Sequence, residues 1–318
     1  MLPCRAMAPV RKKTDRKKLL AAARVGGAAA QLALAKSYER QAPVDLSRAK
    51  HWYLKAATQG LAEAQSCLGD MLADAGDTTG ALRWYQAAAT QGESFAQNNL
   101  AVRLRDDFGQ RRAAIPWFRA AAEQGHSDAQ VSLGYALFEG EGTKRNQAEA
   151  LRWYRAAALQ GHLRAIANIA MMYRAGDVVK ANPETARRWF YKAAIRGHAR
   201  AQYAMSEMSK KPMLSLQWLM HAAGNGHSDA QIELGIAYHE GNHPSGAIAR
   251  DYASALHWYR AAAEQGATWA WYLIGLCFRD GEGVPRSKPT ARTWLRRAAP
   301  HHREARQALQ KLTGAAKR

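Results

Sequence analysis

Eight tryptophans recur along the chain at intervals of 29 to 40 residues, and this spacing constrains the fold more than any other feature. They are Trp52, Trp84, Trp117, Trp153, Trp189, Trp218, Trp258 and Trp294. In seven of the eight places an alanine stands three residues before the tryptophan, and only Ser215 breaks the rule. A coupled pattern at this period indicates a chain built from copies of one supersecondary unit.

The unit is clearest between His126 and Gly161, where two helical patterns flank a short loop that contains glycine. Apolar residues recur at helical spacing from Ala129 to Leu137 and again from Ala150 to Ala158. We therefore expect an antiparallel pair of helices, which must stack on copies of itself because one pair cannot bury its apolar face alone. The first helices share a set of alanines: Ala30, Ala64, Ala96, Ala129, Ala165, Ala201, Ala230 and Ala270.

The combined frame, A-x-x-x-L-G-x-x-Y, then G-x-G, then A-x-x-W-Y-x-x-A-A-x-x-G, resembles the Sel-1-like repeat, a relative of the tetratricopeptide repeat. Residues 230–266 carry it well. The resemblance implies an all-α fold, an α-solenoid (superhelix) of about eight antiparallel helix pairs with a C-terminal capping helix. It implies function only by class, because most family members are adaptors and scaffolds for other proteins. A cysteine-rich secreted branch has been linked to β-lactamase activity, but Cys4, Cys67 and Cys277 lack that branch's pairing within repeats.

The repeats set the expected domain boundaries. Residues 1–26 are a basic segment that we expect to be flexible, and residues 300–318 are a capping helix with a basic tail. Between them we expect eight repeats, with these bounds: 27–60, 61–92, 93–125, 126–161, 162–197, 198–226, 227–266 and 267–299.

The formal net charge of +20 is concentrated at the two ends of the chain. Residues 1–26 carry +7 and residues 286–318 carry +9, whereas the long body between them carries only +4. Basic ends attract nucleic acid, anionic surfaces or acidic proteins without specificity, and this remains an alternative function. The basic start also leaves export open, although Arg24 interrupts the apolar run that a signal peptide needs. No run approaches the ~18 apolar residues of a membrane span.

A candidate binding groove follows from helix geometry. Positions 2, 6 and 9 residues after each first-helix alanine lie roughly opposite the packing side, and in tetratricopeptide-like stacks that side lines the concave surface. An apolar and aromatic floor with a row of cations suits a peptide or helix that carries acidic residues. The candidate partner-binding residues are Asn98, Arg105, Val131, Tyr135, Phe138, Met171, Arg174, Ile236, His239, Tyr272 and Arg279. The expanded loop of the seventh repeat, 241–251, is a second candidate.

Other recurring polar residues fit structural roles. A glutamine follows the first-helix alanine in six repeats, which predicts hydrogen bonds to a neighbouring helix end. His126 and its equivalents follow the glycines that end second helices, which indicates a turn role. His239, His243 and His257 lack a cysteine or paired carboxylates at ligand spacing. No nucleophile, zinc or phosphate-loop motif occurs, so we predict no catalytic residue, cofactor or metal site.

We therefore expect a non-enzymatic scaffold or adaptor of bacterial type, most simply cytoplasmic, that binds a protein partner. Two alternatives remain: a binder of nucleic acid or anionic surfaces through the basic termini, and an exported repeat protein that acts on envelope or host proteins.

Overall fold

A computed structural model describes residues 13–40, 44–176, 178 and 180–314, and in these ranges the protein contains helices and no strands. The first helices of the pairs are α2 (Ala28–Glu39), α4 (Ala62–Asp74), α6 (Ser94–Asp106), α8 (Ser127–Glu139), α10 (Leu163–Ala175), α12 (Ala199–Met208), α14 (Ser228–Glu240) and α16 (Thr268–Asp280). The second helices are α3 (Leu46–Thr58), α5 (Thr78–Thr90), α7 (Arg111–Glu123), α9 (Gln147–Leu159), α11 (Pro183–Ala194), α13 (Pro212–Gly224), α15 (Tyr252–Glu264) and α17 (Lys288–Ala298). Two further helices stand at the ends, α1 (Lys13–Arg24) and α18 (Arg303–Thr313). None of the helices in these ranges combines the length and the apolar character that crossing a membrane requires.

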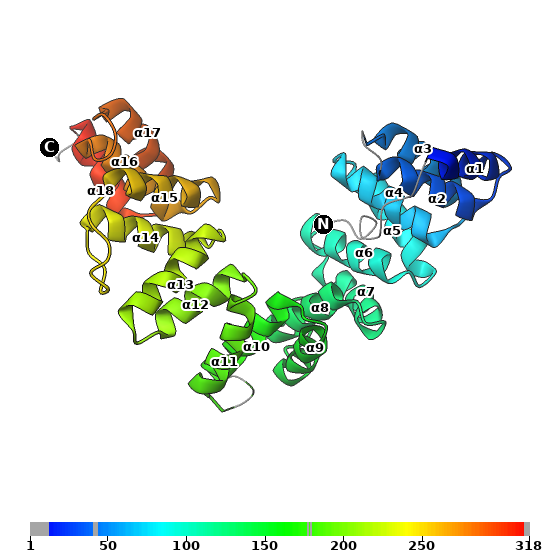
Figure 1. The fold of residues 1–318 in the computed structure, drawn as a ribbon, viewed down its shortest axis with the longest axis horizontal. Coiled ribbons are helices and arrows are strands. Elements are labelled where there is room, and N and C mark those ends of the chain that lie inside the picture. The colour runs from blue at the N-terminus through cyan, green and yellow to red at the C-terminus, as the bar shows by residue number, and fades with distance from the viewer. Residues whose placement is uncertain (1–12, 41–43, 177, 179, 315–318) are drawn as a thin grey trace. The chain divides into compact units, whose positions relative to one another are not determined.

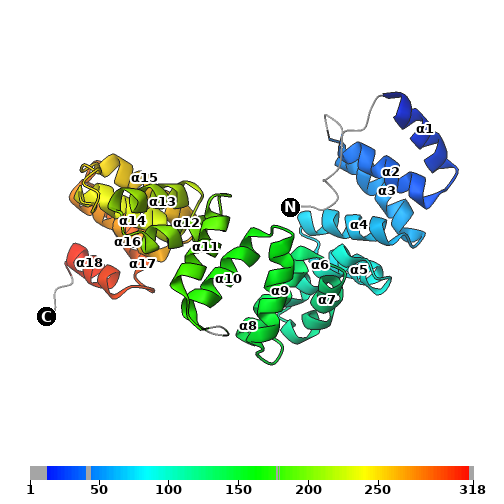
Figure 2. The ribbon, with the colours of Figure 1, turned by 60° about the horizontal axis from the view of Figure 1, so that its bottom comes forward.

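The chain divides into two compact units, residues 1–165 and residues 166–318. In unit 1 each helix packs against the next along the chain, from α1 to α9 (Figure 1). In unit 2 the same succession runs from α11 to α18 (Figure 2). Stacking of consecutive antiparallel pairs confirms the predicted α-solenoid architecture.

Each pair is held together by the residue that follows the repeat tryptophan. Tyr154, next to Trp153, is only 2% exposed, and its ring lies so close to Gly134 of α8 that a Cβ there would come within 2.7 Å of it. Tyr85 and Tyr259 occupy the same place against Gly69 and Gly235. Of the eight tryptophans only Trp52 is buried, at 9% exposed, and the others are half-buried. The tryptophan therefore marks the register, while its neighbour fills the core.

Glutamines join successive pairs. The Gln130 side chain donates from Nε2 to the Ala122 carbonyl of α7 at 3.1 Å, and its Oε1 accepts from Gln160, at the end of α9, at 3.0 Å. One buried amide thus connects three helices, and this confirms the predicted structural role. The donor bonds repeat from Gln31, Gln65, Gln97, Gln202 and Gln231 to Ala23, Ala57, Ala89, Ala194 and Ala223. In the eighth pair the Trp271 indole donates to Ala263 at 3.3 Å instead.

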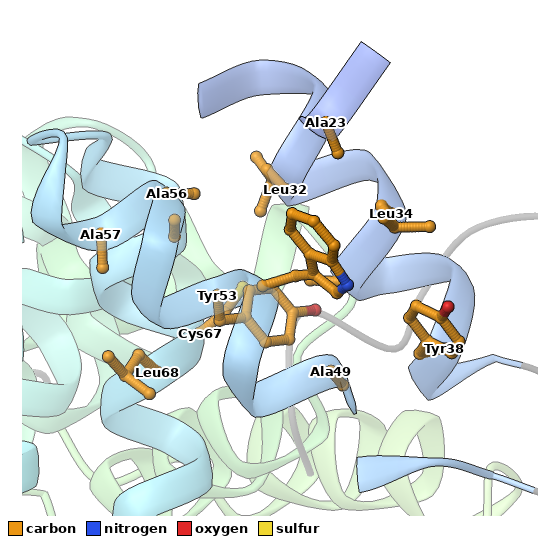
Figure 3. Packing of buried hydrophobic residues seen from close by; sticks show 13 residues of the cluster. Ala23, Leu32, Leu34, Tyr38, Ala49, Tyr53, Ala56, Ala57, Cys67 and Leu68 are labelled. Carbon is orange, nitrogen blue, oxygen red and sulfur yellow. The ribbon is translucent and has the colours of Figure 1, made fainter. Parts of the chain in front are cut away.

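The structure differs from our expectation at the N-terminus, where residues 13–24 form helix α1. Ala23 is 1% exposed and lies in one buried cluster with Leu32 and Leu34 of α2 and Tyr53 of α3 (Figure 3). Its carbonyl accepts the Gln31 bond, so α1 takes the position of a second helix that precedes the first pair. The apolar residues of α1 pack against the first pair, and this packing accounts for the helix. The number of basic residues in this segment did not reveal it. The expectation for residues 1–12 lies outside the described residues.

At the other end α18 packs against α17, as the predicted capping helix should. Ala305 is fully buried and Ala308 is 6% exposed, while the charged residues of α18 face away from the stack. A terminal helix of this kind replaces the neighbour that an inner pair would have. The tail after residue 314 lies outside the described residues.

A buried carboxyl group lies between α4, α5 and α6. The Asp70 side chain, on a residue that is 4% exposed, accepts a hydrogen bond from the Tyr85 hydroxyl at 2.7 Å and another from the Asn99 amide at 2.9 Å. Its second oxygen has no hydrogen-bond partner among the described residues. Burial is the largest influence on its pKa, which is raised from 3.8 to about 6.

Replacing Gln130 with alanine should lower the free energy of unfolding by about 1–3 kcal/mol, because it removes two hydrogen bonds between helices, each worth about 0.5–1.5 kcal/mol. Urea titration followed by circular dichroism measures this. The exposed Gln307→Ala change on α18 is the control and should have little effect. A loss below about 0.5 kcal/mol for Gln130→Ala would contradict the role that we give this bond.

Asp70→Asn should stabilise the protein at pH 7.5 by about 1–3 kcal/mol and leave its stability at pH 4 nearly unchanged. Since the pKa is raised in the fold, folding takes up a proton between about pH 4 and pH 6. Wild-type stability relative to the variant is therefore highest below this window and falls as the pH rises through it. Urea titrations of both proteins at several pH values measure the difference, and a difference that does not vary with pH would rule out a raised pKa.

Candidate partner-binding site

The predicted groove residues differ widely in exposure. Asn98 and Val131 are buried, at 7% and 2% exposed, so they offer little surface to a partner. Tyr135 is the most open apolar member, at 43%. Arg174 is also exposed, and the remaining members are half-buried, namely Arg105, Phe138, Met171, Ile236, His239, Tyr272 and Arg279. The position two residues after the alanine thus belongs to the core in the third and fourth repeats.

Two of the predicted residues, Arg105 and Tyr135, meet at a hollow of about 450 Å³ in unit 1. It lies where the end of α6 and the start of α7 face α8, the loop after α8 and the start of α10. The lining residues are Arg105, Asp106, Arg111, Ser132, Tyr135, Glu141 and Arg164. The other predicted residues do not line this hollow.

The charges in the hollow are only partly matched. Arg105 holds Asp106 through two hydrogen bonds of 2.6 and 3.0 Å, and these bonds keep the pKa of the Asp106 carboxyl below its usual value. Arg111 lies 4.0 Å from Glu141, which is a loose ion pair. Within the described residues, Arg164 has no carboxylate at ion-pair distance. Three guanidinium groups and two carboxylates leave the lining with an excess positive charge.

Three of the basic side chains that we predicted along the groove already have acidic partners in the same chain. Arg174 contacts Glu207 at 3.2 Å, His239 contacts Glu282 at 3.4 Å, and Arg279 contacts the adjacent Asp280 at 2.6 Å. The first two contacts join successive repeats. Arg174 and Arg279 are therefore already paired within the chain, whereas Arg164 in the hollow has no carboxylate at ion-pair distance among the described residues.

Helix-wheel reasoning missed Asp106, Arg111, Ser132, Glu141 and Arg164. It considered one first helix at a time, whereas the hollow is shared by three consecutive repeats. One sequence signal pointed to the Glu141 loop, namely its G-E-G sequence. In the structure Gly142 lies so close to the Arg111 backbone that a Cβ would come within 2.5 Å of it. A close approach of this kind places the loop against the preceding repeat.

The histidines have local roles. The Nδ1 atoms of His126, His198 and His227 accept hydrogen bonds from backbone amides at the starts of α8, α12 and α14, which confirms the turn role for these three. His243 contacts Ser245 in the expanded seventh loop, and Ile248 of that loop is buried against unit 2 helices. Across the ranges that the structure covers, no three His, Cys, Asp or Glu side chains gather as metal ligands would.

Comparison with known proteins agrees with the geometry. The Sel1 repeat family matches residues 28–61, 68–93, 94–126, 127–162, 163–198, 228–266 and 270–299. No curated protein matches the sequence.

Several solved structures share the fold. A Sel1 repeat protein from Oxalobacter formigenes is 27% identical, with a TM-score of 0.70 over 98% of this chain and 97% of its own. The protective antigen c5321 of uropathogenic Escherichia coli, described as displaying an SLR fold, is 30% identical, with a TM-score of 0.66 over 95% of this chain and 68% of its own. Yeast Tom70, at 13% identity and a TM-score of 0.53 over 99% of this chain and 67% of its own, shares the fold alone. With family matches over most of its length and helix pairs stacked as in these structures, the chain belongs to the Sel1 repeat family.

Proposed function

We propose that this protein is a non-enzymatic interaction scaffold whose unit 1 hollow binds an acidic segment of a partner protein. The observation that supports the proposal is the convergence of Arg105, Arg111 and Arg164 around the exposed Tyr135 ring. Sel1 repeats generally serve as interaction scaffolds without catalysis, which agrees with the absence of a catalytic motif in the sequence.

The chemistry of the lining favours a carboxylate ligand. Arg164 is exposed and Arg111 is only loosely paired, so a partner carboxylate can reach both without breaking a strong ion pair. The Arg105 guanidinium is held by Asp106 and also lies 5.3 Å from the centre of the Phe118 ring, which fixes its position before binding. Tyr135 supplies an aromatic surface beside these charges.

The alternative, electrostatic binding through the basic termini, must be tested without damaging the fold. Because α1 and α18 pack on the end pairs, a truncation must spare residues 13–314. A cytoplasmic location is part of the scaffold proposal. Sequencing the N-terminus of the mature protein tests it.

Tyr135→Glu and Arg164→Glu should each reduce partner binding about tenfold, a change of about 1.4 kcal/mol, because each places a carboxylate where we expect the partner's acid. The measurement is quantitative capture of native partners on immobilised full-length protein at moderate salt. The control is Arg83→Glu, the same charge change at an exposed position of α5 away from the hollow.

Capture that survives both hollow variants but disappears when residues 1–12 and 315–318 are removed would favour the electrostatic alternative. Capture equally reduced by Arg83→Glu would show a general effect of charge, and the hollow would lose its assigned role.

A further inference from the structure

Unit 2 carries exposed apolar residues on two second helices that contact each other, α11 and α13. Tyr191 and Ile195, on α11 and at its end, are 50% and 58% exposed, and Met213 and Met220 of α13 are 51% and 45% exposed. Trp218 connects the two helices, because its ring lies edge-on to the Tyr191 ring with centroids 6.2 Å apart. We call these four exposed residues the α11–α13 patch.

The other repeats show which residues occupy the same positions. Two residues after the repeat tryptophan, the third, fourth, seventh and eighth repeats have arginine. The second repeat has Gln86 there and the first has Leu54, which is 45% exposed. The fifth and sixth repeats, which are adjacent, have Tyr191 and Met220. The whole of α13 contains no Asp, Glu, Lys or Arg. Packing does not require an apolar residue at this position, since arginine occupies it in other repeats. The missing charges leave an exposed apolar surface on these helices, which contact with water disfavours.

Two arginines lie beside Tyr191 of the patch, and they share one carboxylate. Arg187, Arg188, Tyr191 and Met205 line a depression of about 230 Å³ beside it. Glu184 contacts Arg187 and Arg188 together, and Lys211 stands exposed at the start of α13. The apolar surface therefore has a positively charged rim.

We infer that the α11–α13 patch is a second docking surface, which binds an amphipathic helix of a partner protein with an apolar stripe and acidic flanks. The stripe would cover Tyr191, Ile195 and Met220, and the acidic flanks would meet the Arg187 and Arg188 side. The rim and the net charge of +20 disfavour a second copy of this chain as the occupant, since like charges would approach each other. This surface lies in unit 2 and does not depend on the unit 1 hollow.

A pair of labelled peptides tests the inference by fluorescence anisotropy with the full-length protein. The probe is an 18-residue helix with leucine at positions i, i+3, i+4 and i+7 of its apolar side and glutamate elsewhere, and its comparison peptide has lysine for glutamate. The glutamate peptide should bind at least tenfold more tightly than the lysine peptide. Met220→Arg, which introduces the residue that other repeats hold there, should weaken that binding about tenfold and leave the circular dichroism spectrum unchanged.

Leu159→Arg is the matched control, because Leu159 is 90% exposed on α9 in unit 1, and it should not affect the peptide. The inference is overturned if the glutamate peptide does not bind, if the lysine peptide binds equally well, or if both variants weaken binding alike. Sedimentation equilibrium tests the other occupant: a dimer that Met220→Arg dissociates would make the patch a contact between copies of this chain, and would also overturn it.

Discussion

The hydrogen bond from a buried glutamine to the end of the preceding helix is the interaction on which the stack depends. The last carbonyl groups of a helix have no partner within that helix, and burying them unpaired would destabilise the fold. Gln130 gives the Ala122 carbonyl a second hydrogen bond beside that from the Gly125 amide, and it accepts one from Gln160, so two helix ends and one helix start are joined by a single side chain. The same bond from Gln31 to Ala23 recruits α1 into the stack.

The buried inside of each helix pair and its exposed surface have different roles. The aromatic residue after the tryptophan and the small residue facing it fill the inside, as Tyr154 and Gly134 do. What remains for recognition is the surface that successive repeats form together, where some ion pairs join one repeat to the next. Arg174 with Glu207 and His239 with Glu282 show that a basic side chain on this surface can join two repeats.

Departures from the repeat pattern are therefore more informative than the pattern itself. Arg164 has no carboxylate at ion-pair distance within the described residues, and it lines the hollow that Arg105 and Tyr135 share. Met220 replaces a common arginine, and it lies on an outward apolar surface. One feature is polar and lies in unit 1, the other is apolar and lies in unit 2, which suits a scaffold that holds two chemically different segments.

The sequence by itself determined the helix pairs, their number, their register and the structural role of the glutamines, because these follow from periodic burial and from a hydrogen bond that recurs in six of the eight repeats. It could not determine that Asn98 and Val131 are buried while Tyr135 is open, since a helical wheel places a side chain on one side of its own helix and cannot show how closely the next repeat approaches. Nor could it show α1, whose apolar side matters only once α2 is present to cover it. The hollow and its unmatched charge were decided by tertiary structure alone, because they arise where three repeats meet.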